Sequence, residues 1–378
     1  MSISTLSFER PAEGRELAAR VDIVLVLTTL VLAAVGVVMV YSATRDHQVA
    51  LGLSSHYYLY RQALFVVLGT VVMVALTAID YHWIEHAATV LYVAIVLALV
   101  AMFAIGHSAL GATRWINLGP FQFQPSAFAV LAEIAVVAAF CARRTEGLER
   151  GDIVKILFAQ AVPIVLVVKQ PDLGSGIVLG VVLLVMLIMA GVPNRYMLLL
   201  LALAALAAFG MIHFGLLKHY QIQRLTSFLH QNTGSQSTTY NLHQSVAAIG
   251  SGGMFGTGLF KGLQTNLAFV PEQQTDFIFS AVGEQLGFVG SATVLVLEGI
   301  ICWRVLRSAQ VARDNLGRLL SIGAFTLIAF SVFENAGMTM GIMPIAGIPL
   351  PFLSYGGSAT LAFFAAVGLA LSVQLRQR

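Results

Sequence analysis

Long apolar segments separated by short polar stretches dominate this chain of 378 residues. A bilayer core about 30 Å thick needs roughly 20 apolar residues in helical conformation, so each segment of that length predicts one membrane-spanning helix. The pattern therefore predicts an all-α polytopic membrane protein, with about ten helices forming one bundle over residues 22–375. The expected spans are 22–42, 62–79, 87–106, 123–141, 153–168, 174–191, 196–215, 276–302, 317–338 and 350–374.

Composition supports this class and excludes others. Hydrophobic residues make up 58% of the chain and charged residues 10%, whereas soluble domains carry about 25% charged residues. A disordered protein, a disulfide scaffold and an ordinary cytosolic enzyme are thereby excluded. The net charge of +3, without a basic stripe, offers no electrostatic footprint for phosphate, so no nucleic acid is expected as a partner.

Lys and Arg are distributed unequally between the two sides of the predicted bundle. If the N-terminus is inside, 14 of the 21 cations lie inside and 7 outside. The positive-inside rule then places both termini in the cytoplasm, including an N-terminal tail of residues 1–21 and a C-terminus of residues 376–378. A long outer loop, 216–275, joins the seventh and eighth helices. The outward cations are Arg45, Arg61, Arg114, Lys169, Lys218, Arg224 and Lys261.

The outer loop is far longer than usual connections, and such loops are typically functional or disordered. Its glycine-rich run, 250–258, lacks the Lys-Ser/Thr pair and the preceding strand of a nucleotide-binding loop. Two interpretations fit this run. One is close backbone packing with tight turns; the other is a cradle of backbone N–H groups for a lipid-linked pyrophosphate.

The segment 269–280 also has two interpretations. Thr275 or Asp276 is placed to cap the following helix by accepting a backbone hydrogen bond. Alternatively, Asp276 is a half-desolvated carboxylate of raised pKa at the outer membrane surface, positioned to take a proton from an alcohol. Glu284 is rotated by about 80° from Asp276 on an ideal helix, so the two are expected to border one cavity.

Other polar groups interrupt the apolar pattern near the outer ends of the helices. Lys169 and Asp172 belong to a short hairpin and form either a local ion pair or part of a site. Trp115, next to Arg114, is typical of an interfacial aromatic anchor. Glu298 and the pair Glu334-Asn335 lie inside helices, where they indicate a polar site within the bundle or a transport path.

Several motifs together resemble a known family. They include Tyr41-Ser42-Ala43, Arg61-Gln62, Lys169-Gln170-Pro171-Asp172-Leu173-Gly174, Tyr240-Asn241-Leu242-His243-Gln244-Ser245, Pro271-Glu272, Thr275-Asp276-Phe277-Ile278-Phe279 and the segment Gly347 to Gly357. Over nearly its whole length the chain resembles the SEDS family (shape, elongation, division and sporulation), polytopic polymerases of bacterial cell-wall glycan. The segment Gly347–Tyr355 and the short N-terminal tail are more similar to the elongation branch than to the division branch.

The resemblance implies a peptidoglycan glycosyltransferase of the cytoplasmic (inner) membrane that uses lipid II and releases undecaprenyl pyrophosphate on the outer face. It implies a class B penicillin-binding protein and other elongation machinery as partners, and Asp276 as the essential carboxylate. We expect the pyrophosphate clamp among Arg61, Arg114, Lys169, Arg224 and Lys261. No cofactor is certain, although a divalent cation, Mg²⁺ or Mn²⁺, is possible. Further substrate contacts are expected from Asp172, Gln244, Glu272, Thr275, Glu284 and Ser354.

One departure from the family pattern concerns two positions after Gln124-Pro125-Ser126. Members of the family usually carry a Glu and, three residues later, a Lys, where this chain has Ala127 and Val130. Losing both charges together avoids stranding one of them in lipid, so the fold is expected to survive.

Three other functions compete with the elongation polymerase. They are a division-type polymerase, a lipid II flippase using Glu298 and Glu334, and a scaffold that only activates its partner. The long outer loop and the lack of an inverted repeat favour the polymerase over a transporter.

Overall fold

The computed structural model describes residues 21–105, 107–109, 112–118, 121–144, 147–214, 221–222 and 236–377. Within these ranges nine helices are long and apolar enough to cross a membrane, and a tenth, α7, is apolar but has 17 residues. A helix lies at each of the ten predicted spans, which confirms the polytopic helical bundle. The ten are α2 (Ile23–Ala50), α3 (Tyr57–Ala78), α4 (Trp83–Ile105), α5 (Pro125–Ala142), α6 (Arg150–Lys169), α7 (Leu173–Met189), α8 (Asn194–His213), α12 (Ile278–Gln310), α13 (Asn315–Thr339) and α14 (Gly357–Leu375).

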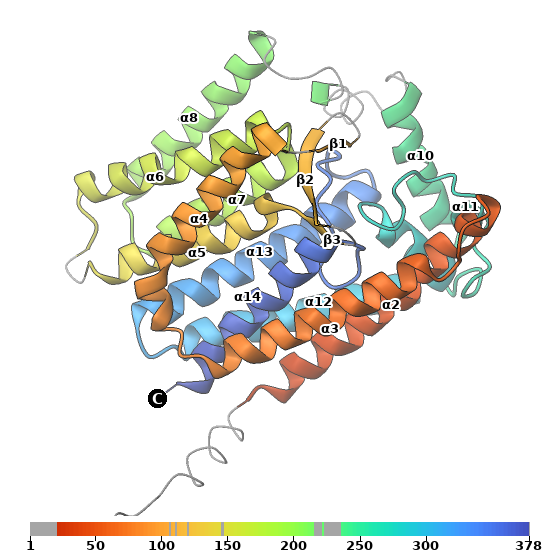
Figure 1. Ribbon diagram of the computed structural model, residues 1–378, viewed down its shortest axis with the longest axis horizontal. Helices are drawn as coiled ribbons and strands as arrows, with labels where there is room; N and C mark the ends of the chain where they lie inside the picture. Colours follow the sequence, from red (N-terminus) through yellow and green to blue (C-terminus); the bar gives the residue numbers. More distant parts are fainter. Residues whose placement is uncertain are drawn as a thin grey trace, which may run out of the picture.

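Helix α14 lies at the centre of the bundle (Figure 1) and packs against α3, α5, α12 and α13. Its most apolar 18-residue stretch is 89% buried, whereas the corresponding stretch of α8, at the periphery, is 6% buried. In a bilayer, the hydrophobic effect does not favour burying apolar side chains inside the bundle, because the lipid tails around them are equally apolar. The exposed apolar surface therefore fits a chain surrounded by lipid.

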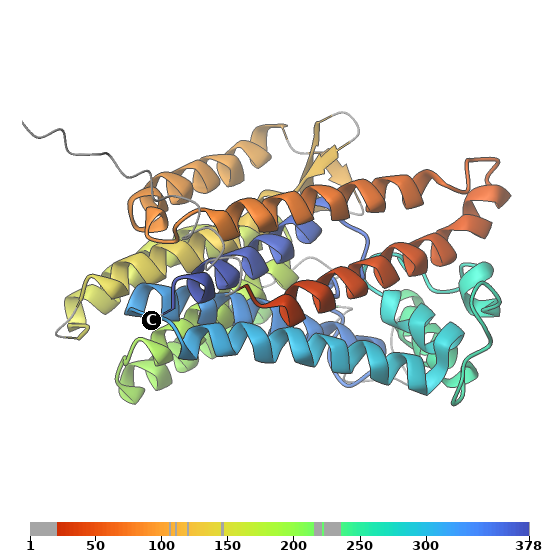
Figure 2. The ribbon, with the colours of Figure 1, turned by 90° about the horizontal axis from the view of Figure 1, so that it is seen from below.

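The two ends of the bundle differ in structure (Figure 2). At one end, called here the C-terminal end, the Asp22 carboxylate before α2 accepts from Arg304 at 2.5 Å and from Gln374 of α14 at 3.3 Å. The other end, called here the loop end, carries helices α10 (Gln236–Ser251) and α11 (Leu263–Asn266). Both termini of the helical bundle therefore lie on the same side, as the alternation of ten spans predicted.

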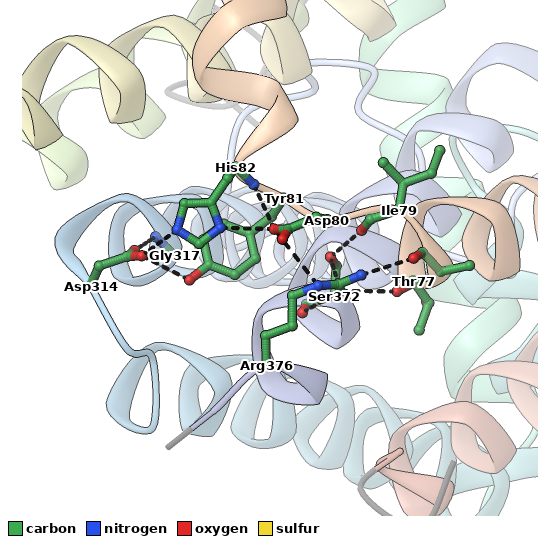
Figure 3. A network of polar contacts seen from close by, with 10 residues as sticks. Thr77, Ile79, Asp80, Tyr81, His82, Asp314, Gly317, Ser372 and Arg376 are labelled. Carbon is green, nitrogen blue, oxygen red and sulfur yellow. Dashed lines mark hydrogen bonds and ion pairs between the residues drawn. The ribbon is translucent and has the colours of Figure 1, made fainter. Parts of the chain in front are cut away.

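A polar cluster joins the α3–α4 connection, the α12–α13 connection and the end of α14 at the C-terminal end (Figure 3). His82 places one ring nitrogen 2.8 Å from Asp80 and the other 2.8 Å from Asp314, the residue that caps α13. Tyr81 donates to the same Asp314 carboxylate, and Arg376 lies 3.7 Å from Asp80. Burial alone would lower the pKa of His82, but its hydrogen bonds to the two carboxylates raise that pKa above its ordinary value. Since both ring nitrogens face acceptors, the imidazolium form fits this site.

The apolar pattern did not predict helices α10 and α11 within the outer loop, a small sheet, or the start of the last helix. A three-stranded antiparallel sheet follows α4 at the loop end, formed by β1 (His107–Ala109), β2 (Ala112–Leu118) and β3 (Phe121–Phe123). The last span begins at Gly357 and not at residue 350. Pro349 and Pro351 explain this difference, because proline lacks the N–H that a helix interior requires.

Glycines bring the run 250–258 against the backbone of α12. Gly287 interrupts α12 with a φ of 66°. At this break the N–H of Phe288 donates to the carbonyl of Gly253 (2.8 Å), so the loop supplies a hydrogen bond that the helix has lost. A Cβ at Gly252 would overlap the backbone of α12. The run therefore packs backbone against backbone, as the first of its two interpretations predicted.

Candidate active site

A cavity of about 250 Å³ lies at the loop end and extends between the membrane-spanning helices. Most of its lining divides by chemistry, and Ser175, Ser331 and Ser358 add hydroxyl groups on α7, α13 and α14. Polar side chains of the loop end line one part: Gln124, Ser126, Glu272, Thr275, Asp276 and Tyr355. Apolar side chains of α5, α7, α13 and α14 line the other: Val130, Val178, Leu327, Ala359, Ala362 and Phe363. The cavity is therefore suited to a molecule with a polar head and an apolar tail.

Asp276 stands on a short loop that leads into α12. The loop turns at Glu272, whose φ of 53° is unusual for a residue with a side chain. The N–H groups of Thr275 and Phe277 both donate to the Glu272 carbonyl, at 3.1 and 3.3 Å. Phe277 is the N-cap residue of α12 and makes no side-chain cap. The capping interpretation of Thr275 and Asp276 is therefore wrong, and both residues line the cavity instead.

The turn 350–355, which precedes α14, holds this loop from the opposite side. The buried Ser354 hydroxyl donates to the Thr275 carbonyl at 2.6 Å and accepts the N–H of Leu350 at 2.8 Å. The N–H of Tyr355 donates to the Gln274 carbonyl at 2.8 Å. Ser354, predicted as a substrate contact, thus supports the loop of Asp276 and is not itself among the lining residues.

Asp172 organises the polar wall formed by the start of α5. Its buried carboxylate accepts from Ser126 at 2.9 Å, from Ser175 at 2.8 Å and from Gln124 at 3.3 Å. It also caps α7 through the N–H of Ser175. Because Ser126 and Gln124 line the cavity and Asp172 does not, the carboxylate acts through these neighbours.

Arg61 contacts the cavity indirectly, through the side chain of the lining residue Tyr355. Its guanidinium stacks over the Tyr57 ring at 4.3 Å and hydrogen-bonds to the Tyr355 side chain. Burial raises the pKa of the Tyr355 phenol, and the bond to Arg61 opposes that rise. The phenol therefore stays protonated at neutral pH and can donate a hydrogen bond into the cavity.

Glu284 does not border the cavity of Asp276, which corrects the expectation from helical geometry. Its carboxylate is buried and accepts from the N–H of Gln264 (2.7 Å), the N–H of Thr265 (2.8 Å) and the Thr265 hydroxyl (2.5 Å). The helix begins at Ile278, after Asp276, so the two acids do not share one helix and the rotation of about 80° does not apply. Glu284 anchors α11 to α12.

The remaining predicted contacts lie elsewhere. Lys169 at the end of α6 and Lys261 in the loop before α11 are exposed, and Gln244 of α10 is half-buried; none of the three lines the cavity. Arg114 belongs to β2, but its side chain lies outside the described residues, as does Arg224 entirely. The pyrophosphate clamp expected among the outward cations therefore stays a prediction.

The residues of the cavity suit a metal ion that is bound partly by substrate phosphates better than one bound by protein ligands alone. Among the described residues, no group of three or more His, Cys, Asp or Glu could hold a metal ion. Two carboxylates, Glu272 and Asp276, line the cavity. Mg²⁺ commonly binds one or two carboxylates together with substrate phosphates and water. Glu272 would hold such an ion together with phosphate oxygens and water, and the ion would neutralise phosphate charge.

Sequence reasoning missed several lining residues. Trp115 was interpreted as an aromatic anchor and Tyr355 was part of a family motif without an assigned role, yet both line the cavity. Gln124 and Ser126 flank Pro125, the first residue of α5. Two polar residues at the start of an apolar helix could have identified them as site residues from the sequence. Ala127 and Val130, where the family pattern has charges, also line the cavity and add apolar surface beyond Gln124 and Ser126 on α5.

Comparison with known proteins gives consistent matches along the chain. The family model of FtsW, RodA and SpoVE, described as cell cycle protein, matches residues 22–378. A probable peptidoglycan glycosyltransferase FtsW of Geobacter metallireducens is 34% identical over 363 residues, covering 95% of this chain and 96% of that protein. The peptidoglycan glycosyltransferase MrdB of Escherichia coli K12 is 36% identical over 316 residues, covering 83% and 84%.

Among solved structures, one described as a peptidoglycan synthase complex that coordinates polymerization and crosslinking has a TM-score of 0.78 and 29% identity to this chain. The match covers 94% of this chain and 97% of the solved chain. The fold and the length of the chain are thus similar to those of these relatives throughout.

Proposed function

The chain belongs to the SEDS family of FtsW, RodA and SpoVE and is a peptidoglycan glycosyltransferase, and we propose that it polymerises lipid II with Asp276 as the general base. The observation that carries this proposal is the position of Asp276. It lines a cavity whose wall combines polar side chains of the loop end with apolar side chains of membrane helices. A lipid-linked sugar has the same division between a polar head and an apolar tail.

The proposed reaction joins two sugars at the cavity. A hydroxyl of the acceptor sugar attacks the anomeric carbon of the donor, and the new C–O bond forms as the bond to the pyrophosphate oxygen breaks. Asp276 takes the hydroxyl proton, and undecaprenyl pyrophosphate leaves with the electron pair. Tyr355, held by Arg61, donates a hydrogen bond to oxygen atoms that gain charge. Glu272 would hold a divalent cation, which supplies positive charge near the phosphate when bound, and Asp276 is left to accept the proton.

The loop end is proposed to face the outside of the cytoplasmic membrane, with both termini in the cytoplasm. Supporting this orientation, the C-terminal end carries Arg304 and Arg376, and the count of Lys and Arg follows the positive-inside rule. A class B penicillin-binding protein is the proposed partner, since a similar solved chain belongs to a complex of polymerization and crosslinking. The proposed role is elongation, on the resemblance of Gly347–Tyr355.

Purified chain, incubated with a class B transpeptidase and labelled lipid II, is expected to form glycan strands on a gel. The Asp276→Ala variant is expected to form none. The same two proteins are tested in liposomes for movement of labelled lipid II across the bilayer. Strands formed at the normal rate by Asp276→Ala would overturn the assignment of the base. Translocation without strand formation would replace the polymerase by the flippase.

A further inference from the structure

Asn335 makes two hydrogen bonds from one buried amide. It lies on α13, is 0% exposed, and its Nδ2 donates to the Asp276 carbonyl at 2.8 Å and to the Ile348 carbonyl at 2.7 Å. Turning the amide over would press its oxygen against two carbonyl oxygens, so the orientation is fixed by chemistry. Both amide hydrogens are used, and Oδ1 has no hydrogen-bond partner within the described residues.

The two carbonyls belong to segments that are far apart in the sequence, and both Asp276 and Ile348 line the cavity whereas Asn335 does not. The carbonyl of Asp276 is the last of three consecutive carbonyls that accept hydrogen bonds from α13 or from the turn before α14. The carbonyls of residues 274 and 275 accept from the turn 350–355. The third bond, from Asn335, comes from the interior of a buried helix and so ties the loop to the core of the bundle.

This arrangement bears on the reaction through geometry. A displacement of about 1 Å of a reacting group can cost about 100-fold in rate, because the reacting atoms must be near one another and aligned. Asp276 is the last residue before the N-cap of α12, and its main chain sets where the carboxylate begins. Without the amide, both carbonyls would lose this donor, and the loop would no longer be tied to α13 at Asp276.

We infer that Asn335 is a positioning residue, which fixes the main chain of Asp276 against that of Ile348 and thereby places the carboxylate for proton transfer. The inference rests on the proposed function of Asp276. Since Asn335 does not line the cavity, it contributes to kcat through Asp276 and leaves the KM for lipid II nearly unchanged.

The test measures kcat, KM and the melting temperature of purified Asn335→Leu, which keeps a side chain of four heavy atoms branched at Cγ and removes the donor. The control is Thr326→Val, a buried position on α13 whose hydroxyl bonds only within its helix and which does not line the cavity. We expect kcat to fall about 100-fold in Asn335→Leu, with KM within twofold of wild type, and Thr326→Val to keep both parameters.

Asn335→Ser is the second variant, and it carries the test if the leucine variant does not fold. Its hydroxyl can serve one carbonyl, so an intermediate kcat is expected. Normal kcat in a folded Asn335 variant, or a raised KM with normal kcat, would overturn the inference. Asp276→Asn is measured in parallel: if it is inactive while Asn335→Leu is normal, only the positioning role fails, whereas an active Asp276→Asn refutes the proposed base.

Discussion

Glu284 offers the sharpest separation between a structural and a chemical role for an acid near the active site. Replacing it by alanine removes the acceptor of three donors, the N–H groups of Gln264 and Thr265 and the Thr265 hydroxyl. A buried donor left unpaired costs about 1–3 kcal/mol. We therefore expect Glu284→Ala to lose about 3 kcal/mol or more of unfolding free energy. Glu284→Gln keeps one acceptor oxygen and should lose less.

The assay follows thermal unfolding in detergent together with limited proteolysis of the segment 252–277. We expect a lower melting temperature and faster cleavage near α11 in Glu284→Ala. Glu85→Gln is the matched control, because Glu85 pairs with Arg143 on the exposed surface and such pairs contribute about 0–1 kcal/mol. A Glu284→Ala protein with wild-type melting and cleavage but no glycan synthesis would refute the structural role and return Glu284 to the reaction.

Two further predictions concern stability. Gly252→Ala should destabilise the loop end, since its Cβ would overlap the backbone of α12, whereas Gly250→Ala, with open space around it, should melt like wild type; equal melting of the two would contradict the packing. His82 has a raised pKa, so its stabilisation is present below its ordinary value of 6.5 and is lost as the pH rises through the folded pKa. Asp80 and Asp314 have lowered pKa values, so their contribution fails only on acidification below about 3.8. The melting temperature of wild type should therefore exceed that of His82→Gln most between about pH 4 and 6.5, and a constant difference up to pH 9 would contradict the ion pairs.

The membrane helices were predictable because apolar runs of sufficient length are a property of the sequence alone. Their ends were less so: α14 starts seven residues after the predicted boundary, where Gly357 follows a turn shaped by two prolines. The sheet at residues 107–123 was missed because its strands are short and its longest one, Ala112–Leu118, contains no strict alternation of apolar and polar residues.

The site was predictable only in part. The motif around Asp276 identified the acid, and in the structure Asp276 lines a cavity together with Glu272 and Thr275. The partners that hold these residues were not visible, because they are separated by long stretches of chain. Asn335 donates to a carbonyl 59 residues away, and Ser354 to one 79 residues away. Main-chain acceptors carry no sequence signal, so such contacts appear only in the folded chain.

The central claim is that the Asp276 carboxylate takes the proton of the acceptor hydroxyl. The most direct test is the rate of glycan strand formation by purified Asp276→Asn, a variant of nearly the same shape without the basic oxygen, alongside its binding of lipid II. A general base accelerates a reaction by about 10²- to 10⁴-fold. The rate of strand formation should therefore fall by about 100-fold or more while lipid II binding persists. Strand formation within twofold of wild type, at unchanged binding, would contradict the claim.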